Sequence, residues 1–174
     1  MSVLPVLELE GQGHVRRRIG GRGFSLIELL VVIAIMSVLA SIGMPLAELA
    51  QQRTKEEALR RSLREIRDAL DVYKRLADEG RIERVAGGSG YPPKLEVLVE
   101  GVKDARSPQG TKLYLLRSLP RDPFAAADVQ PATATWALRS YASPPEDPKT
   151  GMDVFDVHST STAVGFDGVP YKQW

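Results

Sequence analysis

Glu28 is the residue whose position most needs a chemical explanation. It is the only charged residue between Phe24 and Ala47, and no lysine or arginine follows it until Arg53. A carboxylate inside a bilayer costs about 2–3 kcal/mol on insertion scales, so Glu28 requires a partner. A cut between Gly23 and Phe24 would create an α-amine one helical turn before Glu28, on the same helix face.

The partner of Glu28 is expected to come from a second chain. Within one chain the new amine would be the end of the helix itself, and its geometry toward Glu28 would be poor. Between neighbouring chains, the amine of one can meet the Glu28 carboxylate of the next. A buried carboxylate that only a second copy satisfies would drive ordered assembly.

The residues around Glu28 are long enough and apolar enough to cross a membrane. As a helix, residues 24–47 would rise about 36 Å at ~1.5 Å per residue, against about 30 Å for the hydrocarbon core of a bilayer. Four arginines precede the segment, namely Arg16, Arg17, Arg18 and Arg22. The positive-inside rule therefore predicts that residues 1–23 stay in the cytoplasm and that the rest of the chain crosses.

The run Gly23-Phe24-Ser25-Leu26-Ile27-Glu28-Leu29-Leu30 resembles the signature of type IV prepilins and pseudopilins. The resemblance implies that a membrane-embedded prepilin peptidase cuts between Gly23 and Phe24 and methylates Phe24. It also implies that Glu28 serves processing and subunit contact, and that Pro45 kinks the helix. Residues 1–23 are then a leader peptide, and residues 24–47 a transmembrane helix.

Two other interpretations of the N-terminal segment remain open. In one it is a secretory signal peptide, because Val38-Leu39-Ala40 before Ser41 is an acceptable cleavage site. The apolar run is longer than the usual core of a signal peptide, and it begins with a glutamate. In the other it is an uncleaved membrane anchor, which leaves Glu28 without a role.

A charged helix is predicted to continue from the apolar segment over residues 48–86. Its apolar residues recur at spacings of four and three and form one narrow stripe, which is typical of a helix that packs on one side. They are Leu59, Leu63, Ile66, Leu70 and Tyr73. We expect this stem to end at glycine, with Gly80 and Gly87-Gly88 as the stop signals.

Residues 87–174 are predicted to form a globular region with short antiparallel strands. Residues 135–141 are rich in aromatic and branched side chains, and residues 152–160 alternate. The alternation places Met152, Val154 and Asp156 on one face, and Val157 on the other. The expected fold class is α+β and pilin-like, with a long N-terminal helix, its first half in the membrane, packed against a small antiparallel sheet.

A second motif refines the resemblance. Tyr91-Pro92-Pro93, a short helix, and then Leu119-Pro120-Arg121-Asp122-Pro123-Phe124 follow the order seen in the major pseudopilin, or G subunit, of type II secretion systems. Physically, the two prolines bracket a rigid turn, Asp122 can accept from backbone amides, and Phe124 can anchor the turn to the core.

The resemblance implies a structural role. The chain would be a homo-oligomer in a helical filament in the periplasm, held by its helix in the bacterial inner membrane. It would depend on prepilin peptidase, on other pseudopilins and on an inner-membrane assembly platform, and it would help to export folded proteins. The alternatives are a type IV pilin of a surface filament, and a membrane-anchored binding protein or enzyme of the periplasm.

Composition gives little support to catalysis or to nucleic-acid binding. The chain has 23 basic and 22 acidic residues, two histidines and no cysteine. A zinc site is therefore improbable, and no glycine-rich phosphate loop is present. His158 has Asp156 and Ser159 nearby in the sequence, but a triad is defined by geometry in space. We predict that the chain is not an enzyme and binds no nucleic acid.

Calcium is the one cofactor that the resemblance raises, because G-type pseudopilins often bind it in a C-terminal loop. Asp156, Ser159 and Asp167 stand in comparable order in this chain. The family's acidic pair is missing, because residues 169–173 read Val-Pro-Tyr-Lys-Gln. Calcium requires six to eight oxygens, so we predict no cofactor and no tight calcium site. Packing of Tyr171 and Trp174 is the alternative way to hold the loop.

Overall fold

The computed structural model describes residues 24–174, apart from the side chains of residues 42–45. The predicted leader at residues 1–23 and the predicted kink at Pro45 therefore lie outside the described residues. The chain divides into two compact units, and the boundary falls after Pro45, so that the second unit runs from Leu46 to Trp174.

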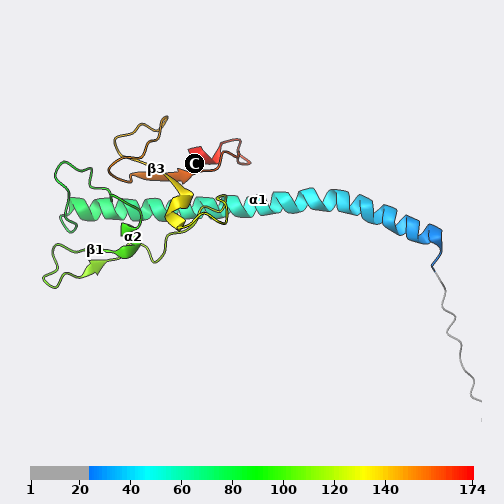
Figure 1. Ribbon diagram of the computed structural model, residues 1–174, viewed down its shortest axis with the longest axis horizontal. Helices are drawn as coiled ribbons and strands as arrows, with labels where there is room; N and C mark the ends of the chain where they lie inside the picture. The colour runs from blue at the N-terminus through cyan, green and yellow to red at the C-terminus, as the bar shows by residue number, and fades with distance from the viewer. Residues whose placement is uncertain (1–23) are drawn as a thin grey trace, which may run out of the picture. The chain divides into compact units, whose positions relative to one another are not determined.

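Helix α1 runs from Leu26 to Asp78 and belongs to both units (Figure 1). Its first part contains a stretch that is long and apolar enough to cross a membrane, with a mean hydropathy of 2.5. All residues from Phe24 to Ser41 are exposed, and none of the apolar stretch is buried within the chain. Such a surface is stable in hydrocarbon or against another apolar surface, and not in water.

The end of α1 is set by glycine. Gly80 has a positive φ of 70°, a conformation that glycine adopts without strain. The Gly80 amide donates to the Ala77 carbonyl (3.1 Å), and the Arg81 amide donates to the Leu76 carbonyl (2.9 Å). These two bonds form a Schellman motif, which satisfies the last carbonyls of the helix. The helical part of the predicted stem therefore ends at the first glycine signal and does not reach residue 86.

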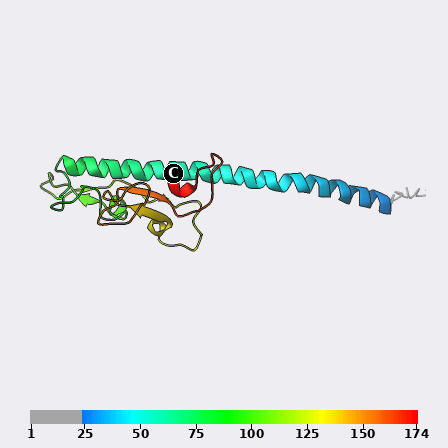
Figure 2. The ribbon, with the colours of Figure 1, turned by 90° about the horizontal axis from the view of Figure 1, so that it is seen from above.

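The apolar stripe of α1 is the centre of the core. Its buried apolar residues are Leu59, Leu63, Ile66, Ala69, Leu70, Tyr73 and Ala77. The rest of the second unit lies on one side of this part of α1, as Figure 2 shows. The same hydrophobic cluster also contains Ile82, Leu95, Leu98, Leu116, Trp136, Val154, Val157 and Tyr171. The stripe that the spacing predicted thus packs against the C-terminal region.

Short elements cover the stripe. After helix α2 (Val97–Glu100), strand β1 (Val102–Lys103) pairs antiparallel with β2 (Lys112–Leu113). The 3-10 helix η1 (Ala132–Thr135) leads into β3 (Trp136–Arg139), which pairs antiparallel with β4 (Asp156–Ser159), and η2 (Tyr171–Gln173) follows. The predicted α+β class with a long N-terminal helix is confirmed, with its antiparallel pairing divided between two small sheets.

The predicted alternation over residues 152–160 is wrong in its first half. Strand β4 begins only at Asp156, and both Val154 and Val157 are buried, although alternation put them on opposite faces. The Val154 amide leaves the strand direction to donate to the Pro92 carbonyl (2.8 Å). Met152, predicted to share the face of Val154, is 91 % exposed.

Candidate functional site

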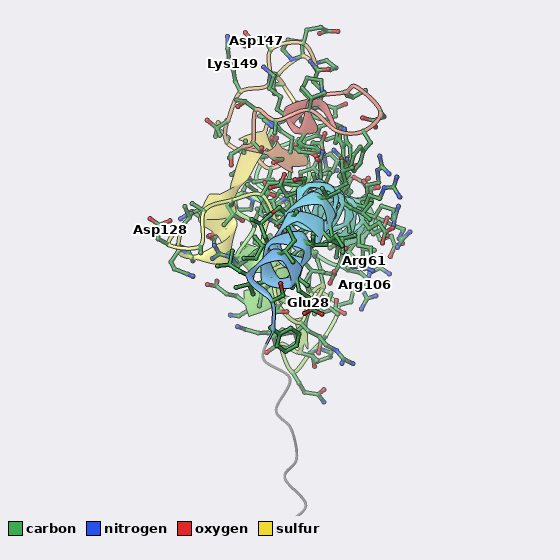
Figure 3. The ribbon with its side chains drawn as sticks, turned by 90° about the vertical axis from the view of Figure 1, so that its right-hand side faces the viewer. Glu28, Arg61, Arg106, Asp128, Asp147 and Lys149 are labelled. Atoms are coloured by element: carbon green, nitrogen blue, oxygen red, sulfur yellow. The ribbon has the colours of Figure 1, made fainter. Side chains whose placement is uncertain are left out.

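Glu28 lies in the first turn of α1 (Figure 3). Its side chain is exposed, and within residues 24–174 it forms no hydrogen bond and no ion pair. A carboxylate in this position also sits well at the positive end of the helix dipole. The helix thus presents one charged group on an otherwise apolar surface.

The side chains around Glu28 are large and apolar. Phe24 is 84 % exposed, and Leu26, Ile27, Leu29 and Leu30 are also exposed within the chain. Farther along, the hydroxyls of Ser37 and Ser41 donate to the carbonyls of Ile33 and Ser37, each at 2.8 Å. The helix satisfies its own hydroxyl groups and leaves Glu28 as the one ionisable group between Phe24 and Ser41.

The three candidate calcium ligands do not form a site. Asp156 is paired with Arg67 (2.8 Å) and with Arg139 (3.2 Å). The Ser159 hydroxyl donates to Asp122 Oδ2 at 2.5 Å, in the buried core.

Asp167, the third candidate, is also bonded to other groups of the chain. Asp167 Oδ2 is 3.2 Å from Arg60 Nη2, and Asp167 Oδ1 accepts from the Val169 amide (3.0 Å). Within residues 24–174 no group of three or more His, Cys, Asp or Glu side chains is placed to hold a metal ion. The residues present do not fit calcium, because cationic side chains already neutralise both carboxylates.

Glu56 is a buried carboxylate that the sequence analysis did not single out. It is 4 % exposed, and its Oε1 accepts from the Phe166 amide (3.0 Å) and from the Tyr171 hydroxyl (2.8 Å). Burial, together with the Glu56 carboxylate, raises the pKa of the Tyr171 hydroxyl. The hydroxyl is therefore a stable donor at neutral pH. The signal in the sequence is faint, since Glu56 stands among many charged residues of the helix.

The residues around His158 do not converge on a catalytic arrangement. The ring Nδ1 is 3.2 Å from the carbonyl oxygen of Ser159. His158 and Asp156 occupy the same outer face of β4, as alternation predicted, while Ser159 is on the buried face. The Ser159 hydroxyl is buried and donates to Asp122, and it forms no hydrogen bond with the His158 ring, so the pair is not arranged as nucleophile and base.

A comparison with protein-family models finds the prokaryotic N-terminal methylation motif at residues 20–44. The match covers the Gly23–Phe24 bond, Glu28 and most of the exposed apolar part of α1. Over these residues the chain carries the N-terminal motif of type IV prepilin-like and pseudopilin-like proteins. Comparisons with curated proteins and with solved structures gave no match.

The motif of this prepilin-like protein implies processing by prepilin peptidase and assembly into filaments in general. It also accounts for the exposed helix, because an apolar N-terminal helix behind such a motif is the arrangement of a single-pass membrane-anchored protein. Phe24, the residue at which the predicted cleavage would leave a new N-terminus, lies two residues before the start of α1 at Leu26.

Proposed function

We propose that this prepilin-like protein is a structural pseudopilin of a type II secretion system. In this proposal residues 1–23 are the leader that prepilin peptidase removes, and Phe24 becomes the methylated N-terminus. Residues 24–47 cross the inner membrane, with a kink at Pro45. Residues 48–86 are the stem, and residues 87–174 form the head in the periplasm. Copies assemble through an inner-membrane platform, with other pseudopilins, into a filament that pushes folded proteins across the outer membrane.

The observation that carries the proposal is the exposed apolar surface of α1 with Glu28 as its one charge. In a monomer this surface is covered only by lipid, and the carboxylate has no partner within residues 24–174. In a filament the helices pack on one another, and the α-amine of one Phe24 neutralises the Glu28 of its neighbour. The same pair then gives both the attraction and the register between copies.

The choice of a type II secretion pseudopilin rests on the head. The segment from Leu119 to Phe124 forms a turn whose Asp122 accepts from the Phe124 amide (2.8 Å), and Phe124 stacks on Tyr171 with ring centroids 4.1 Å apart. Pro92 of the other motif is fully buried. Both motifs of the resemblance are therefore part of the packed core, which supports a head of the G-subunit kind.

The first test is the intact mass of the mature chain, purified from membranes of its own host, with sequencing of its N-terminal fragment. The proposal expects a chain that begins at Phe24 and carries one added methyl group. A start at Ser41 would instead mean a conventional signal peptide, and a start at Met1 or Ser2 a simple anchor. Either of these results would contradict the proposal.

The role of Glu28 is tested by Glu28→Leu. We expect filament assembly, measured by crosslinking in membranes and by secretion into the medium, to be lost, because the amine of the neighbour has no counter-charge. The thermal midpoint of the head should not change. Glu48→Leu removes a carboxylate from the same helix beyond the apolar segment, and it serves as the matched control. Full secretion by the Glu28→Leu chain would overturn the pairing.

Deletion of the gene distinguishes secretion from a surface pilus. Loss of a pseudopilin should retain folded substrate proteins in the periplasm and leave surface filaments in place. If instead the surface filaments disappear and secretion continues, the chain is a type IV pilin. The processing test would give the same result in both cases, so the two experiments answer separate questions.

A further inference from the structure

The C-terminal segment, residues 161–174, is held on α1 by side chains of the helix itself. Glu56 Oε1 receives three donors, because Gln52 Nε2 (3.2 Å) joins the Phe166 amide and the Tyr171 hydroxyl. Gln52 Nε2 is also 3.0 Å from the Tyr171 oxygen. Gln52 and Glu56 are one helical turn apart, so they reach the segment from the same face of α1.

One further turn along, Arg60 makes the next contact. Its Nη2 is 3.2 Å from Asp167 Oδ2, and its guanidinium carbon is 4.2 Å from the centre of the Trp174 ring. Arg67 then donates from Nη2 to the backbone carbonyl of Trp174 (2.7 Å) and from Nε to Asp156 (2.8 Å). A guanidinium suits both tasks, because it stacks on aromatic rings and donates in fixed directions.

We propose that Gln52, Glu56, Arg60 and Arg67 form a clasp that holds the C-terminal segment, residues 161–174, on α1 without a calcium ion. This proposal rests on the ligands that the chain offers. Calcium requires six to eight oxygen ligands, and within residues 24–174 no three carboxylate or histidine side chains converge on one point. The Asp167 carboxylate is instead paired with the Arg60 guanidinium. The clasp joins the end of the segment to the helix directly, with no ion between them.

The inference extends beyond the proposed function, since it concerns how the C-terminal segment is held on α1 within one chain and does not depend on the kind of filament. Its test is made on the full chain in detergent micelles, so failure of assembly would not affect the result. The thermal midpoint of unfolding is measured with excess calcium chloride and with excess EDTA. The clasp predicts the same midpoint in both, within about 1 °C. A saturable rise of several degrees with calcium would overturn the proposal.

Variants test whether the clasp, and not general packing, holds the segment. Glu56→Ala removes the acceptor of three donors and should lower the midpoint by about 5 °C. It should also speed hydrogen exchange of the Phe166 amide by about tenfold, because its acceptor is gone. Glu57→Ala, at an exposed neighbouring position, is the matched control and should change neither quantity. Equal behaviour of the two variants would overturn the clasp.

A second variant, Arg60→Ala, tests the other end of the clasp, with Arg61→Ala as its matched control. Arg61 is exposed and forms no ion pair within residues 24–174, and Figure 3 labels it on the helix. Exchange of amides in residues 163–171 should be faster in Arg60→Ala only. A wild-type chain whose Phe166 amide is unprotected in EDTA would contradict the proposal without any variant, so it remains testable even if a variant does not fold.

Discussion

Asp122 joins three parts of the head that are far apart in the sequence. Its carboxylate accepts from the Ser159 hydroxyl (2.5 Å) and from the Phe124 amide (2.8 Å), and its own amide donates to Thr135 Oγ1 (3.1 Å). The side chain is 2 % exposed, so water cannot replace a lost partner. The turn between two prolines therefore acts as a junction between β3 and β4.

Asp122→Asn is expected to lower the free energy of unfolding by about 2–3 kcal/mol. The side-chain NH2 of asparagine would face either the Ser159 hydroxyl or the Phe124 amide, both of which now donate to the carboxylate. Urea unfolding of the full chain in micelles measures the effect. Asp128→Asn, at an exposed position in the following loop, should change stability little. A similar loss in both variants would show that the junction has no special importance.

Asp153 gives the head a dependence on pH. Burial opposes its ionisation, but hydrogen bonds from Ser89 (2.5 Å), the Tyr141 amide (2.9 Å) and Ser140 (2.8 Å) outweigh burial and hold the pKa of Asp153 below its ordinary value. A depressed pKa in the folded chain contributes stability that is present above the unfolded pKa of about 3.9. That contribution is lost as the pH falls through the folded pKa.

Asp153→Asn should therefore lower the free energy of unfolding most at neutral pH. As the pH falls below about 4, the difference in unfolding free energy between wild type and variant should shrink, because the wild-type carboxyl is also becoming neutral. Unfolding curves at pH 7, 4 and 3 measure it. A difference that stays constant with pH would mean that the loops at Ser89 and Ser140 do not depend on the charge.

Single residues were predictable where the signal is local. Asp122 lies between Pro120 and Pro123, and the turn they form indicated an acceptor for backbone amides, which the structure confirms. Glu56 carries no such signal. Its donors at Phe166 and Tyr171 are 110 and 115 residues away, and no local pattern reports a hydrogen bond over that separation.

At the scale of elements, the sequence predicted the helix and its buried face, but it did not predict the bounds of the strands. The stripe of α1 follows from periodicity, because five apolar residues at helical spacing must share a face. Strand β4 is only four residues long, and its neighbours are held by contacts outside the sheet. The Val154 amide bonds to the Pro92 carbonyl outside the strand pairing, so alternation along one strand cannot indicate that Val154 is buried.

Ile66→Ala measures the importance of the stripe. Ile66 is fully buried at the centre of the cluster, so its truncation should cost about 2–5 kcal/mol of unfolding free energy, through lost burial and the remaining cavity. Met152→Ala removes a side chain of similar size that is exposed, and it should cost almost nothing. If Met152→Ala proved as costly as Ile66→Ala, the burial described for residues 152–157 would be wrong.

At the scale of the whole molecule, the core lies entirely within the second unit. Every residue of the hydrophobic cluster comes after Pro45, and the chain has no cysteine, so packing and polar contacts must hold this unit. The first unit contributes an apolar surface and Glu28. The part of α1 that packs in the core is thus separate from the part that carries the apolar surface and Glu28.

Residues 46–174 are therefore expected to fold in water without the apolar segment. Far-ultraviolet circular dichroism should show a cooperative thermal transition for this fragment. A shorter fragment, residues 58–174, lacks Gln52 and Glu56 and should unfold at a lower temperature. An unfolded 46–174 fragment would show that the membrane part of α1 is needed for the head to fold.

The contacts of Glu56 can form only after the C-terminal segment of a newly made chain has been synthesised. The Tyr171 hydroxyl reaches Glu56 across 115 residues, and the Trp174 carbonyl reaches Arg67 across 107. Contacts this distant in sequence form late, because the intervening chain must first be present and compact. During synthesis α1 is made first, and the C-terminal segment that packs on it is made last. Between those moments the stripe of α1 faces water, so the unfinished subunit is the form most exposed to aggregation and proteolysis.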